Sequence, residues 1–235
     1  MNLNKGLAKK IPLKVIIKII SRILLFFIFM GLLFFLSAGS LKYWEVWAYF
    51  ITLIVPAIFV ITYFLRKDPG LLERRILRRR EKEKEHKSIQ NIFSIIFLAG
   101  LLIPGLDYRY QWSDVPYYIV IISDIFVLAG YLIIVRVMKE NSFATAIIET
   151  QEDQKVIDTG PYKVVRHPMY TGGMIFFLFT PPALGSYWAL IPFLVIIPTA
   201  LVLRIKGEEK LLLATLPGYS DYCQKTKYHL IPFIW

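Results

Sequence analysis

Apolar residues in this chain are gathered into five long blocks, which are separated by short polar or turn-rich segments. The blocks run from 15 to 37, 44 to 65, 89 to 106, 115 to 138 and 170 to 203. A helix needs about 20 apolar residues to cross the roughly 30 Å hydrocarbon core of a bilayer. Three blocks have that length, and the shorter third block carries no charge. The pattern predicts an all-α, polytopic transmembrane bundle.

The last apolar block is too long for a single crossing and is interrupted near its centre. Residues 180–186 include Pro181, Pro182, Gly185 and Ser186, which are residues typical of turns. We therefore expect two helices in a tight hairpin, and about six helices in the whole chain. The alternative is one long, kinked helix.

Basic residues are concentrated in two places and fix an expected topology. The chain has 28 Lys and Arg against 17 Asp and Glu, a formal net charge of +11. Most of this excess lies near the N-terminus and in the loop 66–88. By the positive-inside rule both segments are cytosolic, and an even number of helices places the C-terminus and segment 139–169 there as well. Anionic lipid headgroups explain this basic charge better than a nucleic acid does.

Metal and disulfide chemistry have little support in the sequence. The only cysteine is Cys223, which excludes an internal disulfide. The three histidines, His86, His167 and His229, are far apart and lack the spacing of metal ligands. Asp124 lies in the middle of an apolar block, where we expect a structural role.

The polar residues beside the apolar blocks fall into two segments, 141–173 and the chain from Arg204 onward. Proline at 168 disfavours helical backbone at His167 and suits a first helical position, so a helix is predicted to begin at Pro168. The exposed N–H groups of such a helix start favour an anionic group. Arg204 and Glu208 are four residues apart and share one helix face.

Three motifs in these segments resemble the isoprenylcysteine carboxyl methyltransferase family. They are Thr-Gly-Pro-Tyr at 159–162, Arg-His-Pro-Met-Tyr-Thr-Gly at 166–172, and Arg204 followed by Glu208 and Glu209. The same motifs are similar to those of a wider group of membrane methyltransferases that includes phospholipid N-methyltransferases. The resemblance covers about residues 141–232. It implies a C-terminal methyltransferase core (139–235). The N-terminal transmembrane helices (1–138) are expected from the apolar blocks alone and carry no specific resemblance.

The resemblance also implies a methyl donor, S-adenosylmethionine, in a cytosolic pocket formed by the C-terminal segments. The implied donor contacts are Gln154, Lys155, Val156, Ile157, Tyr162, His167, Pro168, Met169, Tyr170 and Glu208. Arg204 is implied to bind the acceptor and to act in catalysis, with Glu209 beside it. At the position of Gln154 some relatives carry a histidine, so the implied contact at this position is mainly through the backbone.

The expected acceptor is a lipophilic or prenylated molecule, of which the carboxylate of an isoprenylcysteine is the first candidate. A carboxylate is already ionised at neutral pH and requires a cation such as Arg204 to place it. A phospholipid amine would instead require a base, for which Glu209 is the candidate, and a small thiol is a third acceptor. Two alternatives come from other classes. One is an NADPH-dependent reductase of the membrane sterol type, and the other is a non-catalytic membrane scaffold.

Overall fold

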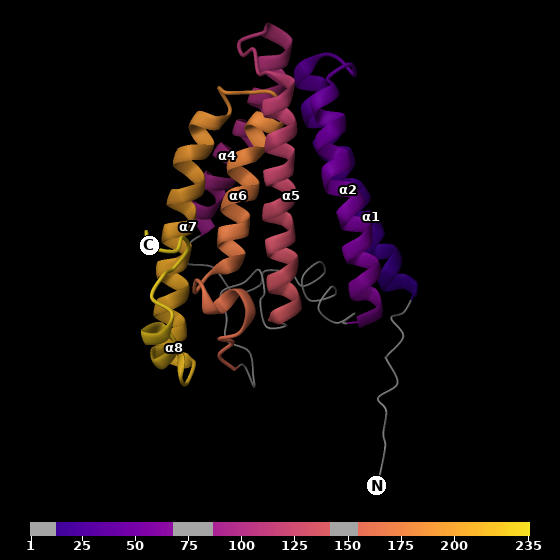
Figure 1. The fold of residues 1–235 in the computed structure, drawn as a ribbon. Coiled ribbons are helices and arrows are strands. Elements are labelled where there is room, and N and C mark those ends of the chain that lie inside the picture. Colours follow the sequence, from indigo (N-terminus) through magenta and orange to yellow (C-terminus); the bar gives the residue numbers. More distant parts are fainter. Residues whose placement is uncertain (1–12, 68–86, 142–154) are drawn as a thin grey trace.

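The computed structural model describes residues 13–67, 87–141 and 155–235, and every regular element in these residues is a helix (Figure 1). The α-helices are α1 (Leu13–Ala38), α2 (Trp44–Lys67), α4 (Lys87–Tyr110), α5 (Tyr117–Glu140), α6 (Pro168–Ala183), α7 (Leu190–Thr215) and α8 (Tyr219–Lys225). A short 3-10 helix, η1 (Gly160–Lys163), precedes α6. The all-α prediction is therefore confirmed for the described residues. The basic loop 66–88 lies largely outside the described residues, and Gln154 lies wholly outside them.

Four helices are long and apolar enough to cross a bilayer: α1 from Ile16, α2, α5 and α7. Their lengths and the apolar side chains on their outer faces make the chain an integral membrane protein. The shorter α6 has 16 residues, about 24 Å at 1.5 Å per residue. The predicted total of six crossings thus stays a prediction.

The predicted hairpin in the last apolar block is confirmed, and the single kinked helix is wrong. Helix α6 ends at Ala183 and α7 begins at Leu190. The backbone N–H of Leu184 still bonds to the carbonyl of Thr180 at 3.0 Å, after which Gly185 adopts a φ of +67°. That left-handed conformation suits glycine because glycine has no Cβ. The chain thereby reverses and α7 packs back against α6.

Helices α5 and α6 pack more closely than any other pair that the structure describes, because glycines face each other at their crossing. A Cβ built on Gly130 would lie 2.6 Å from the carbonyl oxygen of Gly172. A Cβ on Gly172 would in turn lie 2.8 Å from the carbonyl oxygen of Gly130. Small residues permit this approach of two backbones in a membrane. The crossing fixes where α6 begins relative to α5.

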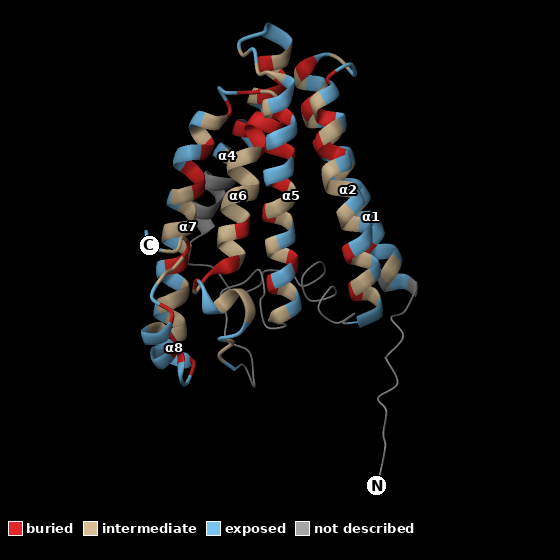
Figure 2. Cartoon of the chain, viewed as in Figure 1, coloured by how far each residue is buried: buried red, intermediate tan, exposed pale blue. Residues whose placement is uncertain are grey.

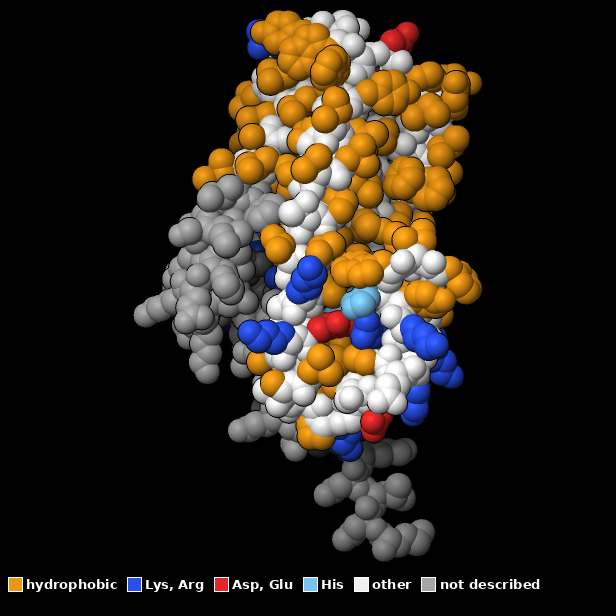
Figure 3. Space-filling view, turned by 90° about the vertical axis from the view of Figure 1, so that its left-hand side faces the viewer, with side chains coloured by type: hydrophobic (Ala, Val, Ile, Leu, Met, Phe, Trp, Pro, Cys, Tyr) orange, Lys and Arg blue, Asp and Glu red, His pale blue; other side chains and the backbone are white. Residues whose placement is uncertain are grey.

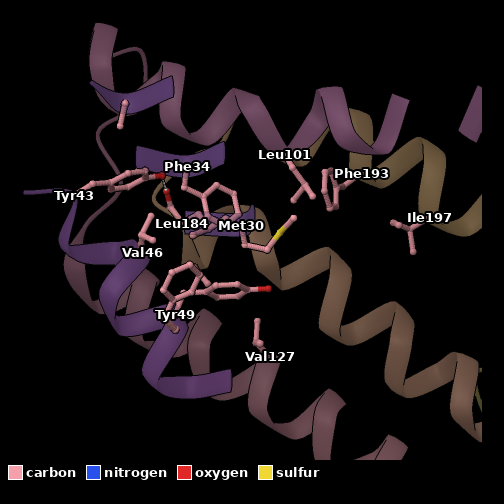
Figure 4. Packing of buried hydrophobic residues seen from close by; sticks show 13 residues of the cluster. Met30, Phe34, Tyr43, Val46, Tyr49, Leu101, Val127, Leu184, Phe193 and Ile197 are labelled. Atoms are coloured by element: carbon pink, nitrogen blue, oxygen red, sulfur yellow. Dashed lines mark hydrogen bonds between the residues drawn. The ribbon is translucent and has the colours of Figure 1, made fainter. Parts of the chain in front are cut away.

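The largest core cluster lies toward the end of the bundle where α1 ends and α2 begins. It contains Phe34, Tyr49, Leu101 and Phe193, from four different helices (Figure 4). Tyr49 shares a hydrogen bond of 2.9 Å with the hydroxyl of Thr180 on α6. Outside this cluster the surface is mostly apolar along the helices, and buried residues line their inner faces (Figure 2).

A buried carboxylate ties the α6–α7 turn to the end of α4. Asp107 accepts hydrogen bonds from the backbone N–H and hydroxyl of Ser113, both at 2.7 Å, and from Ser186 Oγ. In the middle of the bundle, Asp124 of α5 is buried and lies close to Thr52 of α2. The structural role of Asp124 stays a prediction.

Candidate functional site

Charged and polar side chains gather at one end of the bundle, below an almost wholly apolar face of α7 (Figure 3). At this end α1 and α6 begin, and α2, α5 and α7 end (Figure 1). We call it the charged end; on the described helices it carries Lys14, Lys18, Arg66, Lys67 and Lys139. The motif residues of the C-terminal half lie here.

The start of α6 is anchored by the C-terminal segment of the chain. Helix α6 begins at Pro168, as predicted, and His167 is its N-cap residue with non-helical backbone. The backbone N–H groups of Arg166 and His167 donate to the carbonyl oxygens of Tyr228 and His229, at 2.8 and 2.9 Å. These two bonds fix the residues before α6 against a segment about sixty positions later in the sequence.

One carboxylate, Glu209 of α7, joins three basic side chains. Its Oε1 lies 3.1 Å from Nε2 of His167 and 3.2 Å from Nε of Arg166. Its Oε2 lies 3.1 Å from Nε2 of His229. The side chains of His167, Arg166, Glu209 and His229 are only 5%, 10%, 15% and 23% exposed. We call these four side chains the Glu209 cluster; they hold α6, α7 and the C-terminal segment together.

The environment of His229 disfavours its charged form. Burial is the largest effect and, with the positive charge of Arg166, it lowers the pKa of His229 despite the nearby Glu209. The ring also stacks on Trp235, with centroids 4.7 Å apart. Arg166 and Glu209 therefore form the ion pair of the cluster, and His229 is a neutral hydrogen-bonding member.

A second set of contacts joins two side chains of α7 to one side chain of α6. Arg204 Nε donates to the hydroxyl of Tyr170 at 2.7 Å, and that hydroxyl donates to Glu208 Oε2 at 2.5 Å. Arg204 and Glu208 lie on one face of α7, as their spacing predicts. The ring of Tyr170 stacks on His167 at 5.6 Å between centroids, which connects this arrangement to the Glu209 cluster. A tyrosine hydroxyl between a cation and a carboxylate holds both in fixed positions.

Aromatic residues of η1 and α8 form a wall beside these groups. Tyr222 donates to the carbonyl oxygen of Tyr162 at 2.8 Å, and Asn141 donates to the Tyr162 hydroxyl at 2.9 Å. Tyr219 and Tyr222 pack with Val156 in one buried cluster. The hydroxyl of Tyr219 is buried without a hydrogen-bond partner among the described residues. Burial, followed by the charge of Glu209, raises the pKa of Tyr219 well above its ordinary value, so this hydroxyl keeps its proton.

The structure brings together most of the residues that the sequence singled out. His167, Tyr170, Arg204, Glu208 and Glu209 are connected by the contacts described above. The remaining described candidates are Tyr162 and Val156 in the aromatic wall, Pro168 and Met169 in the first turn of α6, Ile157, and the exposed Lys155. Their contact with a methyl donor stays a prediction, and Gln154 lies outside the described residues.

Sequence reasoning missed the contribution of the C-terminal segment. In the sequence His229 lacks a neighbouring ligand residue, and neither Tyr219 nor Tyr222 belongs to one of the three motifs. The only signal in the sequence was the density of aromatic residues after Gly218. Among the described residues, no three His, Cys, Asp or Glu side chains are arranged to hold a metal ion.

Comparison with known proteins gives one match and leaves most of the chain uncovered. Residues 119–214 match the sequence model of the isoprenylcysteine carboxyl methyltransferase (ICMT) family. This range contains nearly all of α5, all of α6 and α7 to its last turn, but none of α1, α2, α4 or α8. No curated protein matches the chain. The region that supplies Tyr170, Arg204, Glu208 and Glu209 is therefore similar to the isoprenylcysteine carboxyl methyltransferase family.

Proposed function

We propose that this protein is an integral membrane methyltransferase that transfers a methyl group from S-adenosylmethionine to a lipid-like acceptor. The proposed acceptor group is a carboxylate, as at the C-terminus of an isoprenylcysteine-type substrate. The observation that carries the proposal is the contact of Arg204 and Glu208 with the two sides of one tyrosine hydroxyl. The family match of residues 119–214 supports the reaction class.

A carboxylate acceptor agrees with the position of Arg204. Arginine is the side chain best suited to a bidentate grip on a carboxylate, and its contact with Tyr170 restricts the guanidinium plane. The acceptor is ionised at neutral pH, so the reaction requires no general base. Arg204 would bind and orient the carboxylate, while Tyr170 and Glu208 hold Arg204 in place.

The surroundings of Glu209 argue against an amine acceptor. A base that takes a proton from an amine must reach that proton through an available oxygen. Both oxygens of Glu209 are already in contact with His167, Arg166 and His229. We therefore assign Glu209 as a positioning residue instead of the catalytic base that an amine acceptor would need. The phospholipid-amine reading becomes the second candidate.

The described residues fit the chemistry of the donor. The buried Tyr219 hydroxyl without a partner suits a hydroxyl or carboxylate oxygen of a ligand. Tyr162 and Tyr222 provide aromatic faces for a planar base or a sulfonium cation. Glu208 suits an ammonium group. When bound, S-adenosylmethionine supplies a methyl group on a positive sulfur, which a nucleophile displaces in line.

The contribution of the protein to such a step is positioning and exclusion of water. The Glu209 cluster fixes the start of α6 and hence the ring of Tyr170, and the C-terminal segment covers the cluster. Low exposure of these side chains strengthens the electrostatic hold of Arg204 on an acceptor carboxylate. The positive charge of the charged end supports a cytosolic location for the site.

The experiment has a binding arm and an activity arm. S-adenosylhomocysteine is titrated by calorimetry into the full chain in mild detergent, beside Glu208→Gln and the control Lys210→Gln, an exposed position on the same helix. We expect micromolar binding that Glu208→Gln weakens about tenfold or more, which is about 1.4 kcal/mol, and that the control leaves unchanged. No binding by a folded sample would contradict the donor, and binding of NADPH instead would favour a reductase.

The activity arm identifies the acceptor. Labelled methyl transfer is measured to an S-prenylated N-acetylcysteine with a free carboxylate, to its carboxamide, to phosphatidylethanolamine and to an alkyl thiol. A base-labile product from the free acid alone, with a raised KM in Arg204→Lys, is the expected result. Labelling of phosphatidylethanolamine instead would move the amine reading to first place. Donor binding without any transfer would favour a non-catalytic scaffold.

A further inference from the structure

A large cavity lies inside the transmembrane bundle, away from the candidate site. Its volume is about 790 Å³, and its walls come from α1, α2, α4, α5 and α6. That size is in the range of small-molecule pockets, roughly 300–1,000 Å³. None of the residues of the Glu209 cluster, and neither Tyr170, Arg204 nor Glu208, lines it. Three of its five helices lie outside the range that matches the methyltransferase family.

The lining continues into packed residues toward both ends of the bundle and includes exposed residues along its side. Toward the charged end Ile19 and Phe64 are buried in a small cluster that joins α1, α2 and α5. Toward the other end the walls are Phe34, Tyr49 and Leu101 of the main core (Figure 4). Between these ends the lining residues Phe26 and Phe29 of α1 and Leu98 of α4 are exposed on the outer surface. A side opening of this kind faces the bilayer.

Hydrocarbon is the occupant that fits these walls. The lining is almost entirely carbon, and two of its polar atoms, the hydroxyls of Tyr49 and Thr180, bond to each other at 2.9 Å. Water requires two to four polar partners, so it gains little here. The acyl chains of the surrounding bilayer match the walls and can enter sideways. On α1 the lining runs from Arg22 to Phe34, about 18 Å at 1.5 Å per residue, which suits an extended chain.

Basic charge marks one end of this lining. Arg22 is a lining residue, and Lys18 lies one turn earlier on the same face of α1. A hydrocarbon core about 30 Å thick corresponds to about 20 helical residues. When α1 leaves this core at its last residue, Ala38, it enters the core near Lys18. Arg22 is then about 6 Å inside the core, from where its long side chain reaches the interface. Two cations at the depth of the headgroups complement an anionic lipid.

We propose that this cavity is a binding site for an anionic phospholipid, with one acyl chain between α1, α2 and α5 and the phosphate bound by Lys18 and Arg22. The bound lipid fills space between the N-terminal helices and the α5–α6 pair. This lipid is a structural component of the bundle and is not the methyl acceptor.

The test measures thermal stability and does not depend on methyl transfer. The full chain in neutral detergent is unfolded by heat with added phosphatidylglycerol or phosphatidylcholine of the same acyl chains. We expect phosphatidylglycerol to raise the midpoint by roughly 5 °C at saturation and phosphatidylcholine to raise it less. The difference between the lipids should disappear in Arg22→Gln and remain in Lys42→Gln, an exposed control at the opposite end of α1.

A second pair of variants tests the cavity itself. Ala57→Phe fills the lining on α2 and should reduce stabilisation by both lipids, whereas Ile58→Phe, at an exposed neighbouring position outside the lining, should not. Equal stabilisation of wild type by the two lipids, or an unchanged lipid difference in Arg22→Gln, would overturn the proposal. So would a raised KM for a prenylated acceptor in Ala57→Phe with normal phospholipid stabilisation, because the acceptor would then be the occupant.

Discussion

Adjacent glycines on α6 should respond to alanine in opposite directions. At Gly172 the new Cβ would lie 2.8 Å from the backbone oxygen of Gly130, with Ile134 Cγ1 at 3.0 Å and Ile133 Cβ at 3.1 Å. Ordinary contact begins near 3.4 Å, so α5 and α6 must separate locally by about 0.6 Å. Overpacking of this kind costs about 1–3 kcal/mol. At Gly173 a Cβ would meet nothing within 4 Å.

Helix propensity favours alanine at both positions, so the two variants differ only in the clash that the new Cβ meets. Alanine is favoured over glycine inside a helix by about 0.5–1 kcal/mol. We therefore expect Gly172→Ala to lower the free energy of unfolding by about 1–2 kcal/mol net, and Gly173→Ala to raise it by about 0.5–1 kcal/mol. The two midpoints should differ by roughly 3–12 °C in a thermal scan in detergent.

The same substitution should affect the site, because Gly172 lies two residues after Tyr170. Separation of α5 and α6 moves the start of α6, so Gly172→Ala should also weaken binding of S-adenosylhomocysteine. Stability that is equal in the two alanine variants would refute the reasoning, since it would show that the α5–α6 backbones are not in contact at this crossing. A stabilised Gly172→Ala would refute it more directly.

Two further predictions concern the Glu209 cluster. Glu209→Gln removes the anion that Arg166 and both histidines share and should lower the free energy of unfolding by about 2–4 kcal/mol, measured by heat or denaturant; an unchanged stability would contradict the buried ion pair. His229 has a pKa below its ordinary value of 6.5 in the folded chain, so the unfolded chain takes up its proton first as the pH falls. The free energy of unfolding should therefore decrease as the pH drops from about 6.5, and this decrease should end once the pH is below the folded pKa of His229. Unfolding midpoints measured at several pH values should decline less in His229→Gln than in the wild type. A variant with the same pH dependence as wild type would show that His229 is not a source of it.

Much of the fold could be read from local pattern. The bilayer requires each crossing to carry an uninterrupted apolar stretch, and this requirement places α1, α2, α4 and α5 within a few residues of their observed ends. Helix α7 continues twelve residues beyond the last apolar block, to Thr215. The helix start at Pro168 followed from the conformational limits of proline and of the residue before it. The reversal after Ala183 followed from a cluster of turn residues, although α6 continued through Pro181 and Pro182 before it ended.

The composition of the site was only partly accessible in this way. Arg204 and Glu208 share a face because of helix geometry, which the sequence reveals. That Tyr170 lies between them depends on how α6 packs on α7, which no spacing on either helix records. The choice of Glu209 as a base candidate was reasonable from its position, but both its oxygens are in contact with basic side chains.

What the sequence by itself determined was an all-α membrane bundle, its terminal hairpin and the motifs of its C-terminal half, because these depend on apolar periodicity and on proline and glycine. Only the tertiary structure decided that the C-terminal segment pairs with Arg166 and His167 and that Glu209 contacts three basic side chains. The cavity among α1, α2, α4, α5 and α6 was likewise visible only in the structure. Such contacts join residues far apart in the chain. They are set by the close α5–α6 crossing and by the burial of the cluster, and local propensity carries no information about either.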